Sequence, residues 1–378
     1  MTAPNPVIPD LLYSELEQEL RNGVVDVMSS KAKWSDILAR TESDNTVDTD
    51  LWRTLVQEVG LAGLPVSEEA GGAGASWREV AVVLEELGKA AAPVPYLGSA
   101  VTGTALLMAL QSSELLAKTA TGETAVSLAV PVDVCPWAPT SNEALTVVTA
   151  DEQGRLTGTI LSVSDALGAD ILLVPVGETV YAVEAGHASI VPVTSLDMTR
   201  QLADITFDSA DAEVIATGTS VGTAIASALT ISAAMLASEQ LGLAEKCLAM
   251  TVEYLKERRQ FGRVLGSYQA LKHRLADLWV EVTQARAVAR YAAGCAANDS
   301  PDLPVASVLA HSLCSTVALN AAQECIQLHG GIGFTWEHPA HLYLKRAKAS
   351  MLMFGGPDAH RARLGELVDI TIGKEVTS

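Results

Sequence analysis

The sequence is poor in aromatic residues and in positive charge. Phe, Trp and Tyr make up only 4% of its 378 residues, whereas hydrophobic residues together make up 49%. The apolar content is mostly Ala, Val and Leu, which favours closely packed helices around a large core. With 45 acidic against 25 basic residues, the net charge is −20. Because binding to nucleic acid depends on a basic surface, general nucleic-acid binding is excluded.

Cysteine patterns that would indicate a disulfide framework or a zinc site are also missing. No Cys-x-x-Cys pair occurs among the five cysteines, Cys135, Cys247, Cys295, Cys314 and Cys325. Free thiols in a reducing cytosol are the expected state. The N-terminus carries neither the basic nor the apolar stretch of a signal peptide, so a cytoplasmic protein is expected.

One long uncharged run, residues 214–238, could mislead. Its length would suffice to cross a bilayer. However, it is rich in Ser, Thr, Ala and Gly and lacks aromatic anchors, which favours a buried helix of a bundle over a membrane span. We therefore expect no membrane association.

The periodicity of the apolar residues changes twice along the chain. Residues 1–125 have helical periodicity, and residues 126–212 carry short β-type runs separated by polar turns, with 203–215 expected as a closing strand. Helical periodicity returns over 213–378. Long helices are expected there over 224–258, 269–296 and 301–328. The predicted order is an N-terminal helical domain, a middle β-domain and a C-terminal bundle of about four helices.

A local reversal of charge stands out in residues 256–274. Six basic residues meet a single acid, Glu257, in a chain of net charge −20. Such a patch can attract a phosphate-rich ligand. On charge alone, a solvated helix face or ion pairs with a partner chain explains the pattern equally well.

Three stretches together resemble the acyl-CoA dehydrogenase family: YLKERRQFGRVLGSYQALKHRLAD, QECIQLHGGIGFTWEHP and the segment 60–95. The resemblance runs through most of the chain, and its motifs are most specific in the last 140 residues or so. It implies that family's fold: an N-terminal α-helical domain, a middle β-barrel domain and a C-terminal four-helix bundle. It also implies FAD, an acyl-CoA substrate and α,β-dehydrogenation, in which a glutamate removes the α-proton and the flavin takes the β-hydride.

The family binds each FAD across a subunit boundary, and the residues that serve the neighbour's FAD are kept. By resemblance, the guanidinium of Arg258 binds the pyrophosphate and Phe261 packs against the cofactor. Gln269 matches the family's glutamine after the turn. Gln327 and Gly331 match positions at the adenosine, and Gly330 permits close approach of the backbone. Cofactor-binding residues are therefore expected at Arg258, Phe261, Gln269, Gln327, Gly330 and Gly331.

The residues that would serve a flavin in this chain's own pocket are not kept. Residues 127–142 lack the family's loop that contacts flavin and acyl-CoA, and Ser162 replaces a tryptophan that covers the flavin ring. At the two positions where the family carries its catalytic glutamate, this chain has Phe354 and Ser232. A serine hydroxyl does not replace a carboxylate base unaided. No catalytic residue and no metal site are expected.

This asymmetry resembles the base-less subunit of the actinobacterial heterotetrameric acyl-CoA dehydrogenases, several of which act on steroid side-chain CoA thioesters. It implies an α2β2 assembly with a homologous catalytic subunit that holds most of the acyl-CoA and shares about one FAD per heterodimer. An electron-transfer flavoprotein would accept the electrons. Two alternatives remain open: an active homomeric enzyme with a relocated base, and a flavin-free binding or scaffold protein.

Overall fold

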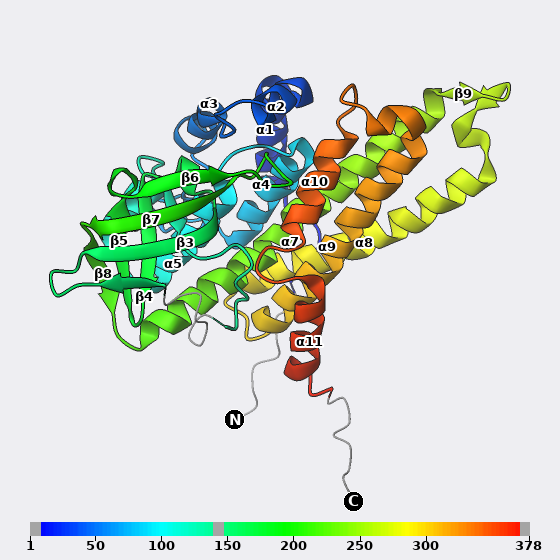
Figure 1. The fold of residues 1–378 in the computed structure, drawn as a ribbon. Coiled ribbons are helices and arrows are strands. Elements are labelled where there is room, and N and C mark those ends of the chain that lie inside the picture. The colour runs from blue at the N-terminus through cyan, green and yellow to red at the C-terminus, as the bar shows by residue number, and fades with distance from the viewer. Residues whose placement is uncertain (1–8, 139–146, 371–378) are drawn as a thin grey trace, which may run out of the picture.

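The computed structural model describes residues 9–138 and 147–370. The N-terminal region is helical, as predicted (Figure 1). Serine residues start two of its helices through capping boxes, Ser14 with Glu17 and Ser76 with Glu79, in which side chain and backbone satisfy each other's free donors. The α-helices of this region are α1 (Glu15–Lys31), α2 (Trp34–Thr41), α3 (Thr49–Arg53), α4 (Trp77–Ala90), α5 (Thr104–Ala109) and α6 (Ser113–Ala120).

The middle domain, expected as a β-barrel, consists of two four-stranded sheets with the orders β1-β4-β5-β8 and β2-β3-β7-β6. Side chains from both sheets, such as Leu156, Leu172 and Phe207, form an apolar core of their own. The strands are β1 (Val126–Leu128), β2 (Val148–Ala150), β3 (Leu156–Ser164), β4 (Ile171–Val176), β5 (Thr179–Glu184), β6 (Ser189–Val193), β7 (Leu202–Ala210) and β8 (Glu213–Thr217).

One predicted strand is wrong in detail. The segment 203–215 is not one strand but parts of β7 and β8, which belong to different sheets and are separated by Asp211 and Ala212. The alternating pattern of this segment hides a change of sheet, because it does not show which partner strand each half pairs with. The last strand of this domain ends at Thr217.

The C-terminal region is a bundle built around α7 (Ser220–Glu257), which contacts α4, α8 and α9 along its length. The other helices are α8 (Gln269–Ala297), α9 (Leu303–His329), α10 (Ala340–Ser350) and α11 (Pro357–Leu367). The three long helices confirm the predicted ranges to within a few residues. Two helices, α7 and α9, are long and apolar enough to cross a membrane, but most of the apolar stretch of each is buried inside the fold.

Two glycines allow α4 and α7 to cross at close range. A Cβ placed on Gly88 would lie 2.2 Å from the carbonyl oxygen of Glu239, and one on Gly242 would lie 2.0 Å from that of Glu85. Each helix thus contributes a glycine against the other's backbone. Without such contacts, the two helices would be held apart by their side chains.

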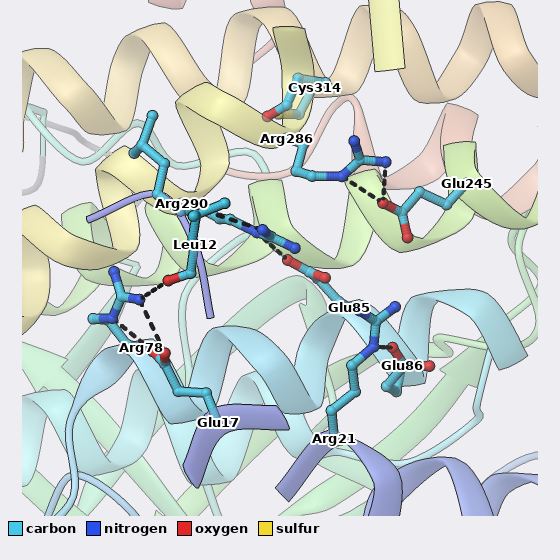
Figure 2. Close-up of polar contacts among 12 residues, drawn as sticks. Leu12, Glu17, Arg21, Arg78, Glu85, Glu86, Glu245, Arg286, Arg290 and Cys314 are labelled. Carbon is cyan, nitrogen blue, oxygen red and sulfur yellow. Dashed lines mark hydrogen bonds and ion pairs between the residues drawn. The ribbon is translucent and has the colours of Figure 1, made fainter. Parts of the chain in front are cut away.

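A network of arginines and glutamates joins the N-terminal segment to α4, α7 and α8 (Figure 2). Arg78 binds Glu17 and the carbonyl of Leu12, while Arg21 binds Glu86. The network continues on α8, where Arg286 donates to Glu245 on α7 and Arg290 lies 3.5 Å from Glu85. These pairs fix the N-terminal helices to the bundle.

The long α7 separates two ends of the molecule (Figure 1). The β-domain lies at its N-terminal end, and the short hairpin of β9 (Arg259–Gln260) and β10 (Arg263–Val264) lies at the other. The hairpin projects from the bundle where α7 turns into α8. The two halves of the expected cofactor site are therefore far apart in one chain.

Candidate functional site

The first part of the candidate site is the surroundings of Phe354, one of the two expected base positions, and it contains little free space. A cavity of about 20 Å³ is left between η3 (Leu97–Gly103), β1 and α7. Thr102, Val132, Leu229 and Phe354 are among its lining residues. This volume holds about one water molecule, so neither a flavin ring nor an acyl chain fits there.

Backbone hydrogen bonds hold this closure in place. The amide of Phe354 donates to the carbonyl of Val132 at 2.9 Å, and the amide of Val132 donates to the carbonyl of Ser162 at 3.1 Å. Ser162 is the residue expected in place of the family's tryptophan. Its backbone amide donates to the carboxylate of Asp204 at 2.9 Å. The segments that carry Phe354, Val132 and Ser162 are thus joined to one another.

Neither of the two expected base positions faces open space. Phe354 is only 6% exposed and adopts a left-handed φ of 56°, directly before Gly355. Ser232 is fully buried, with its hydroxyl 2.8 Å from that of Thr102 and donating to the carbonyl of Ala228 at 2.7 Å. The Phe354 side chain is packed inside the fold, and the Ser232 hydroxyl is used in local hydrogen bonds.

A buried carboxylate on α7, Glu239, is already engaged by two arginines. Its two oxygens accept from Arg200 at 2.5 Å and from Arg346 at 2.8 Å. Arg346 also lies within 3.5 Å of Asp197. Burial alone would raise the pKa of Glu239, but the two guanidiniums outweigh burial and lower it to about 2. A carboxylate with so low a pKa and two cations on it is a poor proton acceptor at neutral pH.

A buried pair of histidines lies behind Phe354. The rings of His311 on α9 and His360 on α11 stack with centroids 4.1 Å apart, and Trp137 meets His360 edge-on. Nε2 of His360 is 3.0 Å from the carbonyl oxygen of Phe354. Within the described residues, both nitrogens of His311 lack a hydrogen-bond partner. Burial, followed by the neighbouring His360, lowers the pKa of His311 to about 3.

This pair predicts a loss of stability in mild acid. The folded pKa of His311 lies below the ordinary value of 6.5, so unfolded chains bind protons first as the pH falls. The stability gained from the neutral pair is full above about pH 6.5 and declines below it. The free energy of unfolding, measured in urea, should fall less between pH 7 and pH 5 for His311→Phe than for the native chain. His187→Phe, at an exposed site, serves as the control, and an equal change in His311→Phe would contradict the assignment.

The second part of the candidate site is an open cavity of about 550 Å³ at the hairpin end of the molecule. It brings together four of the six residues expected to bind the cofactor: Arg258, Gln327, Gly330 and Gly331. Arg258 is the C-cap residue of α7. Gln327 lies in the last turn of α9, and Gly330 and Gly331 follow that helix directly. Residues 69 positions apart (258 to 327) therefore meet on one surface.

The other two expected residues lie outside the lining of this cavity. Phe261 is 90% exposed at the tip of the hairpin, with a left-handed φ of 52°. Gln269 is exposed at the first turn of α8. Both side chains are therefore accessible from solvent.

The charge in this cavity is positive and partly free. Arg274, also a lining residue, is held by a two-pronged pair with Glu324 at 2.7 and 2.9 Å. Among the described residues, the guanidinium of Arg258 makes no hydrogen bond or ion pair. A Cβ placed on Gly330 or Gly331 would meet no atom within 4 Å, so the backbone there is open to approach. These features suit an anionic group such as a pyrophosphate.

Two aromatic residues in the same wall were not predicted to be part of the site. The rings of Tyr254 and His329 stack 4.4 Å apart, and both line the cavity. Nδ1 of His329 lies 2.6 Å from the carbonyl oxygen of Cys325, which orients the ring. The position of His329 directly before Gly330 could have indicated that it lines the cavity. Nothing in the sequence indicated its contact with Tyr254 on α7.

No cluster of metal-binding side chains occurs in the part of the chain that the structure describes. The last residues of the region expected to lack the family loop, 139–142, lie outside the described residues. The preceding residues form β1 and the segment that carries Val132 into the closed pocket.

Known proteins match the chain along most of its length. The family profile described as "Acyl-CoA dehydrogenase, N-terminal domain" matches residues 14–123, and "Acyl-CoA dehydrogenase, C-terminal domain" matches 222–368. Acyl-CoA dehydrogenase IpdE2 of Mycobacterium tuberculosis is 36% identical over 91% of this chain and 94% of its own length.

Two solved structures of two-subunit proteins have a similar fold. The Tcur3481-Tcur3483 steroid ACAD has a TM-score of 0.81 and 30% identity, over 94% of this chain and 98% of that one. The ChsE4-ChsE5 complex from Mycobacterium tuberculosis has a TM-score of 0.83 and 26% identity, over 96% and 100%. The fold expected from the resemblance is confirmed.

Proposed function

The chain belongs to the acyl-CoA dehydrogenase family, whose members are oxidoreductases acting on CH–CH bonds, and on this premise we propose that it is the non-catalytic subunit of a two-subunit dehydrogenase. Its partner is a homologous chain that carries the catalytic glutamate, in an α2β2 assembly. The observation that carries the proposal is the contrast between the two sites: about 20 Å³ around Phe354 against about 550 Å³ at Arg258.

FAD fits one of these sites and not the other. When bound, it supplies the acceptor for the β-hydride of the substrate. The closed pocket around Phe354 has no room for its ring, whereas the open cavity offers a free guanidinium and an accessible glycine backbone. We assign Arg258 to the pyrophosphate, and Gln327, Gly330 and Gly331 to the adenosine end of the partner's FAD. Phe261 and Gln269, which point away from their own chain, contact the same cofactor or the partner around it.

The substrate is an acyl-CoA thioester held mainly by the partner. The relatives suggest its class, since one of the similar structures is described as a steroid ACAD. We propose a steroid side-chain CoA thioester, with an electron-transfer flavoprotein as the electron acceptor and the cytoplasm as the location. Loss of the acyl pocket in this chain would leave the partner room for a bulky substrate.

Co-expression with the candidate partner tests the proposal. This chain alone should purify with little flavin and no dehydrogenase activity, and the complex should hold about one FAD per heterodimer. An active homomeric enzyme would instead hold about one FAD per chain when purified alone. A flavin-free scaffold would add no flavin to the complex. Flavin absorbance per protein, measured with the oligomeric state, distinguishes the three.

Arg258→Ala should weaken retention of FAD in the complex. The free guanidinium provides charge-assisted hydrogen bonds worth roughly 1.5–3 kcal/mol, which corresponds to about a tenfold or greater rise in the dissociation constant. Arg259→Ala is the matched control, because this neighbouring arginine is exposed, carries the same charge and does not line the cavity. Flavin release is measured by fluorescence during dilution. Equal retention in both variants would contradict the role given to Arg258.

A further inference from the structure

A second open cavity, separate from the two sites above, lies between α1, α2, α4 and α7. Its volume is about 590 Å³, within the range typical of small-molecule sites. Residues 337–339 and α10 close its remaining side. Its apolar wall includes Val25, Met28, Trp34 and Met250. Methionines are common at surfaces that accept varied apolar ligands, because the side chain is flexible and polarizable.

Three lysines are among the lining residues of this cavity. Lys89 on α4 is neutralised by Glu86 at 2.8 Å and Glu245 at 3.0 Å. Lys33, the N-cap of α2, and Lys246 on α7 make no ion pair within the described residues. Both also line the cavity. In a chain with 45 acidic and 25 basic residues, two unpaired lysines on one cavity are a local excess of positive charge.

Several polar groups of the cavity wall are bonded to residues other than Lys33 and Lys246. The hydroxyl of Tyr343 is used, because it donates to the carbonyl of Lys89 at 2.7 Å. Nδ1 of His338 accepts from the amide of Ala340 at 3.2 Å. The carboxylate of Glu86 binds Arg21 as well as Lys89. The exposed Glu337 is the other acid of the lining.

We propose that this cavity binds an amphipathic anion, with an apolar body against Trp34, Met28 and Met250 and a carboxylate or phosphate head between Lys33 and Lys246. An inorganic anion would find the charge but would leave the apolar wall exposed to water. A neutral amphipathic ligand would cover the apolar wall but would make no ion pair with Lys33 or Lys246. The ligand therefore needs both parts, as an acyl or steroid acid does.

The cavity adjoins the site assigned to the partner's FAD. His338 lines this cavity, His329 lines the other, and their rings lie 4.2 Å apart. A ligand that moves the ring of His338 would change its contact with the ring of His329. The binding proposal itself uses neither histidine as a ligand and stands independently of the proposed function.

The test uses the full chain and three probes: decanoate, neutral decanol and inorganic phosphate, with cholate as a second carboxylate of different shape. Trp34 is 39% exposed in the cavity wall, so binding should change its fluorescence. Saturable changes are expected with decanoate or cholate, at markedly lower concentrations than with decanol or phosphate. Trp34→Phe should remove the optical signal while calorimetry still detects binding.

The double variant Lys33→Ala, Lys246→Ala should weaken carboxylate binding about tenfold. Lys272→Ala, at an exposed site on α8 outside the cavity, is the matched control. Equal binding in both variants, or equal affinity for decanol and decanoate, would overturn the proposal. So would the absence of probe binding combined with a loss of partner association in the double variant, because the cavity would then be a protein-docking surface. Flavin content of the complex is a separate measurement, so failure here leaves the proposed function untouched.

Discussion

Glu239→Ala should destabilise the chain by about 3–5 kcal/mol, the cost typical of breaking a buried ion pair from one side. The substitution removes the one carboxylate that contacts both Arg200 and Arg346, whose side chains are 5% and 3% exposed. Two guanidiniums would stay buried with part of their partners gone. Urea unfolding followed by circular dichroism measures the loss directly, and low yield of folded protein would be its cellular counterpart.

Glu324→Ala provides the matched control for that experiment. Glu324 also binds an arginine, Arg274, through two hydrogen bonds, but this pair is at the surface. Its removal should cost no more than about 1 kcal/mol. A similar loss in both variants would show that the cluster around Glu239 contributes no more than an exposed pair.

The pH dependence of the same cluster has a definite sign. The pKa of Glu239 is lowered from 4.5 to about 2, so its stabilising effect is full above about pH 4.5 and is lost as the pH falls towards 2. The histidine pair at His311 acts at higher pH, since its unfolded pKa is near 6.5. The contributions of His311 and Glu239 therefore fall in different pH ranges, and comparison of His311→Phe and Glu239→Ala with the native chain separates them.

The features that the sequence predicted well are local or carried by motifs. The long helices follow from apolar periodicity, and Arg258 and Gln327 were placed together by family motifs rather than by any property of the residues themselves. The two expected base positions, Phe354 and Ser232, were also assigned by motif, and that assignment stays a prediction. Phe354 lines the closed pocket, and Ser232 is hydrogen-bonded to Thr102 in its wall.

The features that the sequence missed depend on contacts between distant segments. Arg200 follows β6 and Glu239 lies on α7, and no spacing rule connects them, yet they form a buried ion pair at 2.5 Å. The division of 203–215 into two strands and the stacking of His311 on His360 have the same origin. Such contacts are chosen by the packing of whole domains, which periodicity along one segment does not encode.

The closure around Phe354 has consequences for attempts to restore catalysis in this chain. Phe354→Glu places a carboxylate at one of the family's base positions, but a base acts only within hydrogen-bond reach of the proton it removes. The remaining cavity of about 20 Å³ admits neither substrate nor flavin. We therefore expect no dehydrogenase activity from the purified variant, measured with a dye acceptor and a steroid CoA thioester.

The same substitution should be costly for stability. Phe354 is 6% exposed, and loss of a buried phenylalanine costs about 3–5 kcal/mol even without a new charge. Phe354→Leu is the matched control, since it keeps an apolar side chain and should cost less than about 1.5 kcal/mol. In the complex, Phe354→Leu should leave turnover unchanged.

Removing the base from the partner tests the other side of the same argument. Loss of a positioned base should lower kcat of the complex about 10²–10⁴-fold, whereas no change at Phe354 should alter kcat while the complex remains assembled. Activity gained by Phe354→Glu, or turnover by this chain alone, would mean that the pocket opens in solution and that the chain has a site of its own. If both are absent and the partner's base controls all turnover, one subunit performs the chemistry while this one holds the far end of the cofactor.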